Sequence, residues 1–245
     1  YRAAGSEEIL TATATESPFT ITGLTSGTQY YVSVTAVCGS NEAIPSSTVV
    51  AYTLQDAVAI PYTCDFEEEN HGWILKNASF ANQWHVGIPS NATNGSLFIS
   101  DNGTSANYNI GALSCVVAEK LFQLGATDSI RISFDLTIQG ELEDWYGLWV
   151  YAYDYLKVFF VDPETLIEPT SNINTGFPYY EDGTGVIAGY NSAAHCLAML
   201  TGTQNISVTI ENTPNALKKL VFMWVNDNAG GEQPPAIIDN IMVEP

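Results

Sequence analysis

Residues 219–228 read KLVFMWVNDN and residues 236–241 read AIIDNI, and these two stretches say most about the fold. In the first stretch, apolar side chains occupy both phases of the two-residue strand period, which is typical of a strand buried on both faces. Asp239 interrupts the second stretch, and a carboxylate among isoleucines is costly to bury unless it is hydrogen-bonded or holds a metal ion. We therefore expect two interior strands of a β-sandwich, with Asp239 as the first residue to explain.

The composition is that of an acidic globular chain. Its 245 residues are 46% hydrophobic, and 7 Lys+Arg against 27 Asp+Glu give a formal charge of -20. Such a charge repels phosphate backbones and anionic lipid, which argues against nucleic acid and membrane surfaces as partners. The sequence contains no apolar run of about 18 residues, which is the length that would predict membrane insertion. The acids are either a solvated coat or include divalent-cation sites, and the two alternatives are compatible.

Four cysteines, Cys38, Cys64, Cys115 and Cys196, lie far apart in the sequence. They form no CxxC pair and have no histidines at matching spacing, so a zinc site is not expected. Four cysteines allow three disulfide pairings, and free buried thiols are equally compatible with the sequence.

Residues 1–55 predict part of a small all-β domain. Phe19 and Ile21 alternate with polar residues, and a second alternation runs from Tyr30 to Ala36, which predicts two strands joined by a turn. The spacing from Leu24 to Tyr30 resembles the tyrosine corner of a fibronectin type III domain, which implies a bond from the Tyr hydroxyl to the backbone. A complete domain of that type takes about 100 residues. We expect residues 1–55 to be its C-terminal part, within a longer multidomain chain.

A second domain is expected over residues 56–245, after a linker at residues 55–61. Its predicted strands are short, turn residues separate them, and few helical periods occur, so the pattern favours an antiparallel sandwich. The strands are expected at residues 72–75, 83–86, 96–100, 130–138, 148–153, 155–161 and 206–210, besides the two C-terminal ones.

The order of landmarks in this second domain resembles the cleaved-adhesin and MAM-like jelly rolls of modular surface and secreted proteins of Bacteroidetes. The landmarks are IPYTCDFE at 60–67, GSLFIS at 95–100, ISFD at 132–135, FMWVND at 222–227 and IDNI at 238–241. The resemblance implies an antiparallel jelly-roll β-sandwich preceded by a partial immunoglobulin-like (fibronectin type III) sandwich. It also implies a secreted or cell-surface location, with a glycan or extracellular protein as ligand and further domains of the same chain as neighbours.

The resemblance further implies a structural calcium ion where the first and last strands of the jelly roll meet. Glu67 and Asp239 match the two acidic positions, and Asp101 and Asn102 supply oxygen ligands from a loop. Calcium takes six to eight oxygen ligands, so this chemistry suits it. The alternative is that Asp239 caps a turn and Glu67 is solvated.

Two segments combine aromatic rings with acids, as glycan recognition requires. The first, ELEDWYGLW at residues 141–149, contributes Glu141, Glu143, Trp145 and Tyr146; the second, FPYYEDG at residues 177–183, contributes Tyr179 and Tyr180. The alternative is that the rings belong to the core, because large apolar rings are usually buried. The segment from Glu141 to Tyr153 is also longer than the resemblance predicts, as an insertion would be.

Enzyme activity is not expected. Glu141 and Glu143 share one strand face, as the paired carboxylates of sandwich-fold glycosidases do. The third acid of that pattern is replaced by Trp145. We therefore expect a non-catalytic binding or adhesion module with a structural calcium; the alternative is an accessory or spacer domain of a secreted peptidase or glycoside hydrolase.

Overall fold

The computed structural model describes residues 1–68, 71–145, 149–173, 177–179, 187–188 and 196–245, with the backbone alone for residues 144–145, 149–150, 177–179 and 187–188. Within these residues the chain is all-β and contains no helix, so the predicted fold class is confirmed. The chain divides into two compact units, Tyr1–Asp56 and Ala57–Pro245. Each unit is described by itself below.

The first unit has a three-stranded antiparallel sheet and one hairpin. The sheet contains β1 (Arg2–Ala3), β2 (Gln29–Val32) and β5 (Val49–Tyr52), and the hairpin β3 (Val37–Cys38) and β4 (Asn41–Glu42). The hydroxyl of Tyr30 accepts a hydrogen bond of 3.0 Å from the N–H of Thr25. The predicted bond from this hydroxyl to the backbone is therefore confirmed.

The predicted strands of this unit are longer than the observed ones. No strand forms at Phe19 and Ile21, and the strand that begins at Gln29 ends at Val32 rather than Ala36. Tyr30 is the one buried hydrophobic side chain in the unit, and Phe19 is 45% exposed. Alternation alone did not produce a strand at Phe19, because no second apolar layer in this unit covers that segment.

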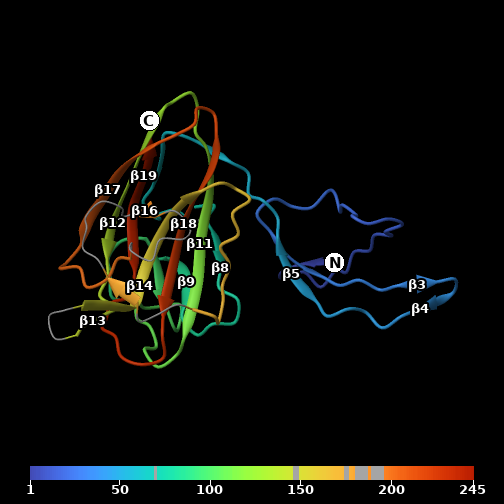
Figure 1. The fold of residues 1–245 in the computed structure, drawn as a ribbon, viewed down its shortest axis with the longest axis horizontal. Coiled ribbons are helices and arrows are strands. Elements are labelled where there is room, and N and C mark those ends of the chain that lie inside the picture. Colours follow the sequence, from blue (N-terminus) through green and yellow to red (C-terminus); the bar gives the residue numbers. More distant parts are fainter. Residues whose placement is uncertain (69–70, 146–148, 174–176, 180–186, 189–195) are drawn as a thin grey trace. The chain divides into compact units, whose positions relative to one another are not determined.

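The second unit contains two sheets. The first has the order β13-β14-β18-β11-β6, with β8 also beside β11, and β15 and β16 beside β14. Its members are β6 (Val58–Ala59), β8 (Ile74–Lys76), β11 (Ser114–Gln123), β13 (Glu141–Trp145), β14 (Trp149–Val161), β15 (Phe177–Tyr179), β16 (Ile187–Ala188) and β18 (Leu217–Asn226). Figure 1 shows β14, β18 and β11 running side by side. The pairs β6–β11 and β14–β16 are parallel and the others antiparallel.

The second sheet has the order β17-β12-β19-β10-β9, with β7 also paired to β19. Its members are β7 (Tyr62–Cys64), β9 (Gln83–Gly87), β10 (Ser96–Ser100), β12 (Ser129–Thr137), β17 (Gln204–Glu211) and β19 (Ile237–Glu244). All of its pairs are antiparallel.

The main core lies between these sheets. Phe222 of β18 packs edge-on against Phe134 of β12, with ring centroids 5.2 Å apart, and also contacts Trp73. The alternate positions of residues 130–138 that were predicted to face the core, Ile130, Ile132, Phe134, Leu136 and Ile138, are all fully buried, and all but Ile138 belong to β12. The unit is therefore a sandwich, as predicted.

The outer face of the first sheet is also covered. Val221 and Val225 of β18 are buried there against Phe159 and Tyr155 of β14. Ile167 and Cys196, from the segments that follow β14 in the sequence, pack on the same face. The prediction that residues 219–228 form a central strand buried on both faces is thus confirmed. Buried charges share this face: Lys76 and Lys219 both pair with Glu119, at 2.9 and 3.3 Å.

Two predicted boundaries are wrong. The segments expected at 148–153 and 155–161 form one strand, β14, because its first part pairs with β13 and its second with β18. The predicted linker at 55–61 ends earlier, since Val58 and Ala59 form β6 against β11. All four cysteines are free thiols. No helix long and apolar enough to cross a bilayer occurs among the described residues.

Candidate functional site

Asp239 lies at a junction of three strands. On one edge of β19, β7 pairs at Ile241 and β10 pairs at Ile238, while β12 occupies the other edge. Asp239 and Asn240 therefore lie in the gap between β7 and β10. Asn240 has a φ of 50°, a left-handed conformation that asparagine tolerates better than most residues, and the register of β12 against β19 shifts beside it.

Three further acids, Asp65, Glu67 and Asp135, act on Asp239 through their charges, and we call this place the β7–β19 junction. Burial is the largest cause that raises the pKa of Asp239, and the charges of the other three raise it further. The N–H of Asn240 opposes this by donating to Asp239 Oδ1 at 2.6 Å. The carboxylate of Asp135 accepts from the side-chain amides of Asn205 and Asn240, at 2.8 and 2.9 Å.

Glu67 is held toward the same junction. Its Oε1 accepts a hydrogen bond of 2.8 Å from the N–H of Gly95, the residue before β10. The carbonyl of Phe66 passes so close to Gly95 that no Cβ could fit there. A glycine is therefore required for this approach, which places the segment after β7 beside the start of β10.

The loop residues predicted as further calcium ligands are elsewhere. Asp101 and Asn102 follow Ser100 at the far end of β10, and a five-residue strand spans about 17 Å. Asn102 Oδ1 accepts from the N–H groups of Thr104 and Ser105, at 2.9 and 3.1 Å, and so organises its own turn. The grouping of Asp101 and Asn102 with Glu67 and Asp239 is thus wrong; the acids whose charges act on Asp239 are Asp135, Glu67 and Asp65.

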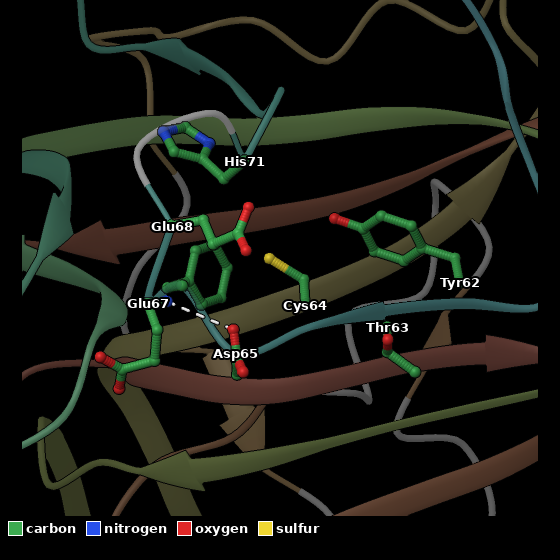
Figure 2. A pocket seen from close by; sticks show the side chains of 8 residues that line it. Tyr62, Thr63, Cys64, Asp65, Glu67, Glu68 and His71 are labelled. Carbon is green, nitrogen blue, oxygen red and sulfur yellow. Dashed lines mark hydrogen bonds between the residues drawn. The ribbon is translucent and has the colours of Figure 1, made fainter.

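A cavity of about 360 Å³ lies beside this junction, lined by residues 62–68 and His71. Figure 2 shows the side chains of Asp65 and Glu67 on one side of the segment and those of Glu68 and His71 on the other. Tyr62 accepts from the indole of Trp73 at 3.2 Å, and burial raises its pKa. Asp65, Glu67 and Glu68, the acids that line the cavity, are exposed and so accessible to ions from solution.

The described parts of the two aromatic segments predicted as ligand-binding, β13 and β15, both pair with β14. β13 pairs with the first half of β14, from Trp145↔Trp149 to Glu141↔Asp154. β15 pairs with the same half of β14, from Val150↔Tyr179 to Ala152↔Phe177. We call these three strands the β13–β14–β15 ribbon. Of the supposed insertion at 141–153, residues 141–145 form β13 and residues 149–153 belong to β14.

Of the predicted ligand-binding residues, Glu141 and Glu143 are described in full. Glu143 pairs with Tyr151 across the ribbon and, through a side-chain hydrogen bond and its charge, raises the pKa of Tyr153, after the larger effect of burial. Trp145 and Tyr179 are placed by their backbones on β13 and β15. Tyr146 and Tyr180 lie outside the described residues.

Three carboxylates converge at the base of the ribbon. One oxygen each of Glu141, Asp154 and Asp227 lies within 4.8 Å of the others, and we call this group the ribbon-base acids. Asp154 is fully buried; burial raises its pKa to about 7, and the charges of Asp227 and Glu141 add to that effect. The pKa of Glu141 is raised by burial first and by Asp227 and Glu143 next. Oxygen-only ligand sets of this kind suit calcium or magnesium.

Asp154 is fixed from two directions. The hydroxyl of Tyr108 donates to its Oδ2 at 2.6 Å, and the N–H of Asp227 donates to its Oδ1 at 2.9 Å. Gly231, at a φ of 104°, passes so close to Tyr108 and Asp154 that a Cβ would collide with both. The loop after β18 is therefore shaped around these acids.

Asp154, Asp227 and Tyr108 were not predicted as site residues. Asp154 stands in the apolar run of β14 just as Asp239 stands in that of β19. The argument that a carboxylate in such a run needs a partner applies equally to both. Nothing comparable in the sequence marks Tyr108, which reaches Asp154 from a loop 46 residues away.

No protein-family model and no curated protein matches the chain. Solved structures with a similar fold include the CBM22-1 xylan-binding domain of Paenibacillus barcinonensis Xyn10C, at TM-score 0.38 and 10% identity over 75% of this chain and 92% of that one. A second is titled "CBM4 structure and function", at TM-score 0.34 and 12% identity over 75% and 94%.

A third is the enzymatically active domain of tailspike protein 4 of bacteriophage CBA120, at TM-score 0.37 and 12% identity over 74% of this chain. The chain covers only 20% of that tailspike chain. TM-scores this low identify neither a function nor a shared site.

Proposed function

We propose that the chain is a non-catalytic binding module of an exported multidomain protein, which holds a glycan through the β13–β14–β15 ribbon. The observation that carries the proposal is the position of the two aromatic and acidic segments. They are more than 25 residues apart in sequence, yet they pair with the same half of β14. Aromatic rings beside carboxylates offer both stacking and hydrogen bonding, which sugar rings need.

The described acids of the ribbon favour binding over hydrolysis. Glycoside hydrolysis needs two carboxyl groups that both reach the substrate. Asp154, the acid paired with Glu141 across the ribbon, is fully buried under Tyr108 and the loop after β18. Glu143 pairs with Tyr151 rather than with another acid. Asp154 is thus closed to a substrate, and Asp227, the other acid within 4.8 Å of Glu141, is half-buried.

A structural calcium ion at the β7–β19 junction is part of the proposal. Asp65, Glu67, Asp135 and Asp239 raise the local negative charge, and only amide groups and N–H donors among the described residues compensate it. An ion there would tie the segment after β7 to β12 and β19. Calcium should raise the melting temperature of the EDTA-treated protein reversibly, and Asp239→Asn should reduce that shift; equal melting in EDTA and in calcium would argue against the ion.

Binding itself is tested with a panel of soluble polysaccharides and extracellular-matrix proteins, followed by titration of the strongest ligand. Trp145→Ala should weaken binding about 30-fold, because a Trp at the centre of a binding surface contributes about 2 kcal/mol. Leu166→Ala, at a residue that is 72% exposed, is the matched control and should leave the affinity unchanged.

Three outcomes would redirect the proposal. No binding to any member of the panel would favour the spacer alternative. Binding to a matrix protein alone would replace the glycan by a protein ligand. Release of reducing sugar from a bound polysaccharide would show an enzyme.

A further inference from the structure

The ribbon-base acids carry more negative charge than their surroundings compensate. Glu141, Asp154 and Asp227 repel one another, and the donors that the structure describes for Asp154 are one hydroxyl and one N–H. Asp227 Oδ1 accepts from the N–H of Ala229 at 2.7 Å. Like charges at this distance in a buried site are unfavourable unless a proton or a cation joins them.

One oxygen of this group has no partner. Glu141 Oε2 is buried and, among the described residues, receives no hydrogen bond. An unsatisfied carboxylate oxygen costs the desolvation of a charged group, which is larger than that of a neutral one. The backbone at Gly230 covers this carboxylate so closely that a Cβ there would lie 2.5 Å from Oε1. This oxygen is thus shielded from water, and its carboxylate belongs to the group of three acids that lie within 4.8 Å of one another.

The acids are close enough together for one calcium ion to contact all three. Calcium–oxygen bonds are about 2.4 Å long, so two oxygens on opposite sides of one ion lie about 4.8 Å apart. The ligand oxygens of the three acids lie within 4.8 Å of one another. Magnesium is usually bound through one or two carboxylates and keeps several waters, so a set of three carboxylates favours calcium.

We propose that Glu141, Asp154 and Asp227 bind a calcium ion at the base of the β13–β14–β15 ribbon, separate from the one proposed at the β7–β19 junction. The ion joins β13, β14 and the loop after β18, and it gives the buried Oε2 of Glu141 its partner. This site does not depend on which ligand the ribbon holds.

The test is calorimetric titration of the EDTA-treated and dialysed full chain with calcium chloride alone. Glu141→Gln is the main variant, because Oε2 has no hydrogen bond to lose and the fold is therefore spared. It should weaken one class of calcium site at least about tenfold, since affinity follows the charge of the ligand set. Asp227→Asn should do the same. Circular dichroism of each variant checks that the sandwich has folded.

Asp239→Asn is the matched control, since it alters the other acidic junction and leaves the ribbon-base acids intact. It should remove a different class of site, and the double variant should remove both. Calcium titrations of Glu141→Gln and Asp227→Asn that are identical to that of the wild type would overturn the proposal, and so would a wild-type chain that binds no calcium. Failure to bind glycans would affect only the proposed function of the ribbon.

Discussion

The two units of the chain show similar alternating apolar patterns in sequence, but the extent to which their apolar side chains are buried differs greatly. In the first unit Tyr30 is the one buried hydrophobic side chain, while Val34 and Ile44 are 69% and 93% exposed. In the second unit, Phe134 and Phe222 of opposite sheets meet in a core closed to solvent. Alternation specifies which face of a strand is apolar; a core forms only where a second layer meets that face.

The largest expected effect comes from separating the units. Residues 57–245 alone should unfold cooperatively, with a midpoint close to that of the full chain, because they contain the core. Residues 1–56 alone should give no cooperative transition, since chains of this size are marginal even with a good core. Thermal melts followed by circular dichroism test both. A cooperative melt of the short fragment would contradict the comparison.

A matched pair of Phe→Ala substitutions, one in each unit, tests the same contrast at the level of single side chains. Phe222→Ala should lower the free energy of unfolding by about 3–5 kcal/mol, because it leaves a cavity against Phe134 and Trp73. Phe19→Ala, at an exposed position of the first unit, should change it by less than about 0.5 kcal/mol. Urea denaturation measures both, and similar losses would show that Phe19 is covered in solution.

Charged groups give a smaller contrast. Glu119→Gln should lower the free energy of unfolding by about 3 kcal/mol, because the buried Lys219 would lose the acid described as its partner, while Lys76 would keep its pair with Glu168 at 2.7 Å. Arg2 of the first unit lies over the ring of Tyr31, 4.7 Å from its centroid. Arg2→Gln should change the stability by no more than about 1 kcal/mol. Denaturation curves in low and high salt measure the loss of stability in both variants. An unaffected Glu119→Gln variant would mean that the two lysines have sufficient other partners.

Local pattern in the sequence predicted much of the sandwich. The run at Leu220–Val225 indicated a strand buried on both faces, and Ile130–Ile138 indicated one face of a core strand. Both are periodic signals that a strand carries within itself. The continuity of β14 could not be predicted in this way, because it arises from two different neighbours, β13 and β18, far apart in sequence.

The site residues show the same distinction between local pattern and tertiary pairing. Glu67 and Asp239 were predicted, and the structure places both at the β7–β19 junction, while Asp101 and Asn102 lie at the other end of β10. Strand registers decide which acids meet, and registers depend on tertiary pairing. Asp154 carried a readable signal, an acid in an apolar run, whereas its partners Tyr108 and Asp227 come from loops that only the folded chain brings together.

The continuity of β14 has a mechanical consequence. A tether pulling on the ribbon would transmit its force along the strand into the ladder from Tyr155 to Val161, where β14 pairs with β18. Those backbone bonds lie across the direction of the pull, so they share the load in shear rather than opening one after another. If the ribbon holds a ligand as proposed, the backbone bonds between β14 and β18 would together resist a pull on that ligand.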